Sequence, residues 1–109
     1  MKNFEYVNEQ NFEEKVLNAK MPVIVYFWTM WSADCQKYDY VLDKIEQKFR
    51  GSLIFVGINV NECPNLTQKY NVQVLPTTLF FKNGQYKIKE NGILSETILL
   101  SQIKRIIKD

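Results

Sequence analysis

The sequence predicts an α/β domain: a central mixed β-sheet of about five strands flanked by about four helices. Two apolar, β-rich runs at residues 23–28 and 53–58 have the composition of parallel strands that are covered on both faces. A helical pattern separates them, which implies a right-handed parallel crossover. A hairpin dipeptide, Asn83-Gly84, follows later in the chain and makes the sheet mixed. With 109 residues, 46% of them hydrophobic, we expect one domain over residues 1–109.

The N-terminal part is expected to form a short strand and a helix. Residues 4–7 favour a strand, and residues 8–19 have helical spacing with an apolar face made by Phe12, Val16 and Leu17. Asn11 followed three residues later by Glu14 fits a capping box. The 23–28 strand that follows is the expected centre of the sheet.

A long helix is expected from residue 33 to residue 49. Its apolar residues recur at positions 35, 38, 42, 45 and 49, which is the spacing of one helical face, and Gly51 is placed to end the helix. This puts Cys35 in the first turn, facing the sheet.

The second half of the chain alternates strands and helices. Pro64 suits the first position of a short helix that reaches Tyr70, with Asn71 as a left-handed cap. Strands are expected at residues 77–82 and 86–89, joined by the type I′ turn. Ser95 then caps a final helix, whose apolar stripe consists of Ile98, Leu99, Ile103, Ile106 and Ile107.

Composition excludes several classes of function. The net charge is only +2 with no basic run, so we expect no nucleic-acid partner. The longest apolar run is too short to span a bilayer, and the start of the chain has no apolar leader, so we expect a soluble, cytoplasmic protein without a membrane partner. The chain has no histidine and only two cysteines, which removes the usual general base and any ordinary zinc site; we expect no metal and no cofactor.

Three motifs stand in a fixed order along the chain. Trp-Ser-Ala-Asp-Cys at residues 31–35 heads the long helix, Val-Leu-Pro-Thr at 74–77 places its proline 41 residues after Cys35, and Phe-Phe-Lys-Asn-Gly follows at 80–84. Together with the order of elements, these motifs resemble the thioredoxin family over essentially the whole chain. Members of that family carry Trp-Cys-Gly-Pro-Cys at the turn and a cis-proline beside it.

The resemblance implies a protein-disulfide oxidoreductase that serves cell redox homeostasis. Its partners would be protein thiols and disulfides or extended peptides, with a thiol reductant as a further partner. It also implies a cis peptide bond before Pro76 and a substrate groove lined by Trp28, Trp31, Val60, Leu75, Pro76, Gly92 and Ile93.

Ser32 stands where the family has its attacking cysteine, so no disulfide can form within the motif. We expect Ser32 to cap the helix, because no histidine is present to activate its hydroxyl. Cys35 occupies the resolving position, and any redox activity would make it a monothiol. Asp34 disfavours a thiolate there and the helix N-terminus favours one, which leaves two readings, an inert core thiol and a slowly reactive one.

The family's buried carboxylate and its paired lysine correspond to Tyr26 and Gly57, so both charges are absent together. Their joint absence favours a natural serine at position 32 over an engineered cysteine replacement, although both origins remain open. The alternative function is a non-catalytic module that binds peptides at the cis-Pro76 groove; a structural or regulatory domain of a larger assembly is a third.

Cys63 follows a predicted strand and directly precedes Pro64. We expect it in a loop, solvent-facing or half-buried, where a reagent reaches it more easily than Cys35. It is therefore a possible secondary thiol.

Overall fold

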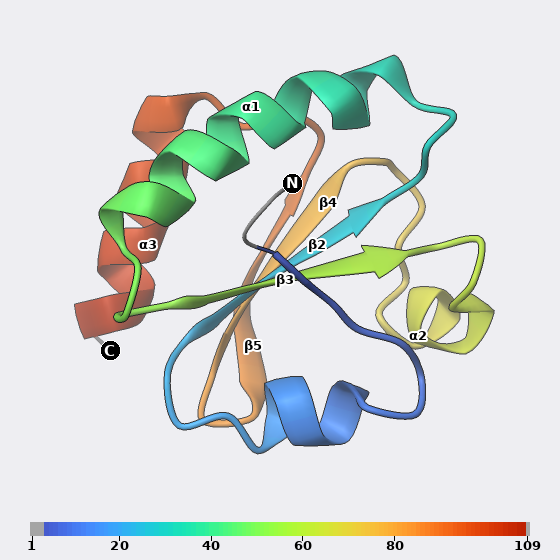
Figure 1. The fold of residues 1–109 in the computed structure, drawn as a ribbon, viewed down its shortest axis with the longest axis horizontal. Coiled ribbons are helices and arrows are strands. Elements are labelled where there is room, and N and C mark those ends of the chain that lie inside the picture. The colour runs from blue at the N-terminus through green and yellow to red at the C-terminus, as the bar shows by residue number, and fades with distance from the viewer. Residues whose placement is uncertain (1–3, 109) are drawn as a thin grey trace.

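The computed structural model describes residues 4–108, which form a five-stranded mixed sheet with helices on both faces (Figure 1). The strand order is β1-β3-β2-β4-β5; β1 and β2 run parallel to β3, whereas β4 is antiparallel to β2 and to β5. The strands are β1 (Glu5–Tyr6), β2 (Val23–Trp28), β3 (Ile54–Asn59), β4 (Thr77–Lys82) and β5 (Gln85–Asn91). The helices are η1 (Glu13–Leu17), α1 (Ala33–Lys48), α2 (Pro64–Lys69) and α3 (Glu96–Lys108).

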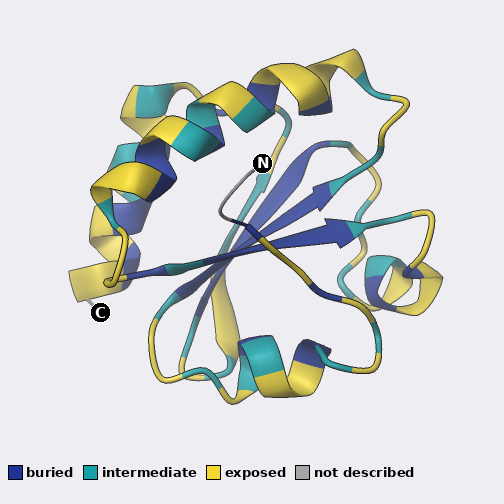
Figure 2. Ribbon diagram, in the orientation of Figure 1, coloured by how far each residue is buried: buried dark blue, intermediate teal, exposed yellow. Residues whose placement is uncertain are grey.

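β2 lies at the centre of the sheet, as predicted, and its side chains enter two separate cores. Ile24 and Tyr26 pack with residues of α1 and α3, while Val25 and Phe27 pack with residues of η1 and α2. This alternation follows from the two-residue period of a strand. Figure 2 shows the consequence: the central strands are buried and the outer faces of the helices are exposed. Within residues 4–108 no helix combines the length and the apolar character that crossing a bilayer requires.

The N-terminal helix is shorter than predicted. Residues 8–19 were expected to be helical, but only Glu13–Leu17 form a helix, and it is of the π type. The expected capping box between Asn11 and Glu14 is wrong. Instead, the Asn8 side chain accepts hydrogen bonds from the backbone N–H groups of Gln10 and Asn11, which holds a turn and delays the start of the helix.

Several local predictions are confirmed by backbone geometry. α1 starts at Ala33, and Gly51 after its end has a φ of +90°. Asn83 and Gly84 have φ of +54° and +78°, as a type I′ hairpin requires. Asn71 is left-handed with φ +52°, and Ser95 Oγ accepts a hydrogen bond from Ile98 N at 3.2 Å at the start of α3.

Candidate functional site

Ser32 is the N-cap of α1. Its backbone is extended, and its Oγ accepts a hydrogen bond from Cys35 N at 3.1 Å. The hydroxyl thus satisfies one of the free N–H groups at the helix start, which is the role expected from the sequence. The Ser32 hydroxyl is thus used to cap the helix, and the chain has no histidine that could take its proton.

Cys35 lies in the first turn of α1 and faces the sheet, where only 2% of its surface is exposed. Trp28 and Leu75 pack against the core cluster that contains it. The Tyr26 hydroxyl donates a hydrogen bond to the Cys35 backbone oxygen at 2.8 Å, and its ring meets that of Tyr38 edge-on at 5.5 Å. The buried phenol of Tyr26 therefore has the hydrogen bond that its burial requires.

A partly buried carboxylate stands next to this phenol, one helical turn beyond Cys35. Burial raises the pKa of the Asp39 carboxyl, the nearby Tyr26 hydroxyl opposes the rise, and Asp43 adds to it. Burial also raises the pKa of Tyr26, with Asp39 as the next cause, so the phenol stays neutral. Sequence reasoning missed Asp39; its position four residues after Cys35, on the same side of the helix, was the available signal.

The predicted groove residues lie on both sides of β2. On the β4 side, the Leu75–Pro76 peptide bond is cis, and Gly92 N donates to Pro76 O at 2.7 Å. On the β3 side, Val60 N donates to Trp28 O at 3.0 Å. The structure thus joins these predicted residues in two pairs, one on each side of the C-terminal end of β2.

Four exposed apolar side chains belong to the turn or to the loops that carry the other predicted groove residues. Trp31 is 81% exposed and Ile93 43% exposed; Met30 and Val74, which sequence reasoning did not single out, are 60% and 45% exposed. Pro76 is buried and Leu75 is half-buried.

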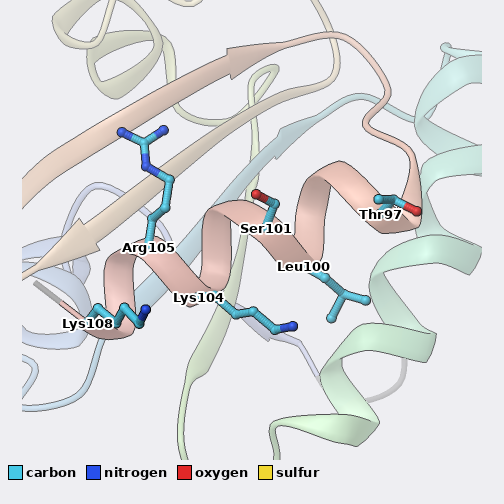
Figure 3. A pocket seen from close by; sticks show the side chains of 6 residues that line it. All are labelled: Thr97, Leu100, Ser101, Lys104, Arg105 and Lys108. Carbon is cyan, nitrogen blue, oxygen red and sulfur yellow. The ribbon is translucent and has the colours of Figure 1, made fainter.

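Two surface cavities within the described residues 4–108 bear on this question, and Pro76 lines neither of them. The larger, about 460 Å³, is an open surface along α3, and Figure 3 shows its side chains pointing in different directions from that one helix. The smaller, about 250 Å³, includes Trp28 and lies on the β1 side of β2.

The prediction for Cys63 is wrong: its side chain is only 1% exposed. It belongs to the core cluster on the η1 and α2 face, and its Sγ lies 3.9 Å from Val7 O. Burial, then Glu9, then Glu62 raise the pKa of this thiol. α2 begins directly after it and packs Leu66 on the same core, which folds the cysteine inward. Cys63 is therefore a structural thiol.

Comparison with known proteins gives the site its context. A family model named thioredoxin matches residues 3–105. The chain belongs to the thioredoxin family. This thioredoxin-like chain is 31% identical over 101 residues to a thioredoxin of Rickettsia felis, covering 93% of the chain and 96% of that relative. It is 33% identical over 101 residues to a thioredoxin of Synechocystis sp., covering 93% and 94%.

An M-type chloroplastic thioredoxin of Spinacia oleracea is 31% identical over 107 residues, which is 98% of this chain. The chain spans 59% of the length of that plant relative. In this thioredoxin-like chain, the site combines the serine cap at position 32 with the buried phenol of Tyr26, which is hydrogen-bonded to the Cys35 backbone.

Proposed function

We propose that this thioredoxin-like protein carries out slow thiol–disulfide exchange with protein partners, using Cys35 as a single thiol. The observation that carries the proposal is the position of Cys35 at the head of α1, packed beside Trp28 and Leu75 of the groove. Leu75, which precedes Pro76, packs against the core cluster that contains Cys35, so an extended segment held at Pro76 would lie close to this cysteine.

The exchange proceeds in two steps. The Cys35 thiol loses its proton to solvent, and the thiolate attacks one sulfur of a partner disulfide, forming a mixed disulfide and releasing the other partner sulfur as a thiolate. An external thiolate then attacks the partner's sulfur, which remains bonded to the external thiol while Cys35 leaves as a thiolate. Two features make the first step slow: Ser32 cannot attack, and Cys35 is 2% exposed.

Thiol exchange by a single cysteine needs a compartment in which thiols stay reduced. Both cysteines of the chain are free, and we infer that the protein works in the cytoplasm, which is such a compartment.

Intact-mass analysis after incubation with glutathione disulfide tests the proposal. We expect one glutathione on Cys35, an unchanged adduct in Cys63→Ser and none in Cys35→Ser. Ser32→Cys should raise insulin reduction at least tenfold, yet below ordinary thioredoxins, because Tyr26 and Gly57 supply no charged pair for proton transfer. Absence of a Cys35 adduct, or an adduct on Cys63, would contradict the proposal.

A second candidate function is peptide binding without chemistry. It is favoured by the burial of Cys35 together with the exposure of Trp31, Val74 and Ile93. An extended segment would pair with the backbone at Pro76 as an added strand, which needs no thiol. Affinity for a reduced peptide that is unchanged in Cys35→Ser, combined with no glutathione adduct on the parent chain, would select this function.

A further inference from the structure

The cavity of about 250 Å³ lies beside the candidate site, at the C-terminal ends of three neighbouring strands. A glycine lies in the sheet beside this cavity. Gly57 of β3 pairs with Tyr6 of β1 on one side and with Tyr26 of β2 on the other, so a residue without a side chain lies between two tyrosines. The cavity is lined by Tyr6, Val7, Trp28, Gly57, Asn59 and Glu62.

Two aromatic rings form its wall. The rings of Tyr6 and Trp28 are 5.9 Å apart and tilted by 58°, and Tyr6 is 56% exposed. Aromatic faces attract cations, and arginine also stacks on them. The wall thus suits a planar, positively charged group.

Glu62 adds a carboxylate at the rim. Among residues 4–108, the salt bridges of the structure join Lys15 to Glu5, Arg50 to Glu46, and Lys44 and Lys48 to Glu96; none uses Glu62. An exposed carboxylate beside aromatic faces is the arrangement that binds a guanidinium group by charge-assisted hydrogen bonds.

Carboxylates lie near the cavity on both sides. On the α1 side, burial and then Asp39 and Asp43 raise the pKa of Tyr6. On the α2 side, burial and then Glu9 and Glu62 raise the pKa of Cys63. Of these carboxylates, Glu62 lines the cavity itself.

The cavity is fixed relative to the 32–35 turn. Thr29 Oγ1 donates to Asn61 Oδ1 at 2.7 Å, which ties the loop before the turn to the loop that carries Glu62. Asn61 N in turn donates to Asn59 Oδ1 at 2.9 Å.

We propose that this cavity binds a basic side chain, arginine in preference to lysine, of the protein segment presented to Cys35. The inference deepens the proposed function, on which it rests, by naming the partner class: segments with a basic residue near the reacting cysteine. Trp28 lines this subsite and also packs against the core cluster that contains Cys35.

The experiment uses two short peptides without sulfur, acetyl-Gly-Arg-Gly-amide and acetyl-Gly-Gln-Gly-amide. Each is titrated into the full ¹⁵N-labelled chain while the indole N–H resonances of Trp28 and Trp31 are followed by NMR. We expect the arginine peptide to shift the Trp28 resonance and to bind at least tenfold more tightly than the glutamine peptide. Glu62→Gln should weaken the arginine peptide about fivefold or more, whereas Glu14→Gln, an equal charge change on exposed η1, should leave it unchanged.

Equal affinity for the two peptides would overturn the inference, as would equal losses in Glu62→Gln and Glu14→Gln or shifts confined to Trp31. Because the peptides cannot exchange disulfides, this result is independent of the glutathione experiment. A Cys35 adduct without arginine binding refutes only the subsite, and arginine binding without an adduct refutes only the redox proposal.

Discussion

At the residue scale, the chemistry of this thioredoxin-like protein depends on which polar groups lie near Cys35. The Tyr26 hydroxyl donates a hydrogen bond to the Cys35 backbone oxygen, and the Asp39 carboxylate of α1 acts on this phenol. Asp39 Oδ1 is buried and has no hydrogen-bond partner among the described residues. This carboxylate is consequently held in an environment that favours its protonated form.

Asp39→Asn tests that environment. The pKa of Asp39 is raised above 3.8 in the folded chain, so the folded state binds its proton more tightly than the unfolded state does. The stabilisation from this group is therefore complete below about pH 4 and is lost as the pH rises through the folded pKa. Asp39→Asn should raise the free energy of unfolding relative to the parent at pH 7, and the advantage should shrink towards pH 3.5.

Urea unfolding at a series of pH values measures this difference, with Asp43→Asn as the control for removing one charge from the same helix. A gain that is constant with pH, or equal in both variants, would show that titration of Asp39 is not its cause.

At the element scale, the hairpin between β4 and β5 is held against η1 through a glycine. A Cβ at Gly84 would lie 2.8 Å from Leu17 O, at the end of η1, and Gly84 has φ +78°. Gly51 after α1 has a similar φ of +90° but nothing within 4 Å of its Cβ position. Substitution of Gly51 therefore carries only the cost of a left-handed backbone, whereas substitution of Gly84 carries that cost and the cost of a steric clash.

We expect Gly51→Ala to destabilise the fold by about 1 kcal/mol, the cost of a left-handed non-glycine residue. Gly84→Ala should cost roughly 2–3 kcal/mol, because the clash with a backbone oxygen adds to the same conformational cost. Urea unfolding midpoints compare the two variants directly. Equal losses would mean that η1 moves away freely and does not support the hairpin.

At the scale of the whole molecule, the two cysteines lie in the cores on opposite faces of the sheet, so the labelling of each one measures the unfolding of its own face. Cys35 lies in the core under α1 and α3, and Cys63 lies in the core under η1 and α2. β2 supplies side chains to both cores, so we expect the faces to unfold together.

Alkylation with iodoacetamide in increasing urea tests this cooperativity. Cys63 should be labelled only as the circular dichroism signal is lost, because it is 1% exposed and its pKa is raised. Cys35 should be labelled slowly in the native state, ahead of Cys63, if it serves in exchange. Fast native labelling of Cys63 would show that α2 opens on its own and that the two faces are separate units.

The sequence by itself determined the elements whose signals are local. The bounds of β2 and β4, the start of α1, the serine caps and the type I′ turn were all predicted, because apolar periodicity, cap residues and turn dipeptides act within a few positions of the chain. The site residues Ser32 and Cys35 followed from the same local pattern, together with the resemblance to the thioredoxin family.

Only the tertiary structure decided which residues distant in the sequence pack together and how they change each other's burial and pKa. Cys63 is buried because Val7, 56 residues earlier in the chain, packs in the same core. Tyr6 meets Trp28 because β1 and β2 both pair with β3, and Asp39 acts on Tyr26 because α1 packs over β2. The burial of a side chain and the electric field around it depend on every chain segment that packs against it. The spacing of residues along the sequence does not show which distant segments pack together.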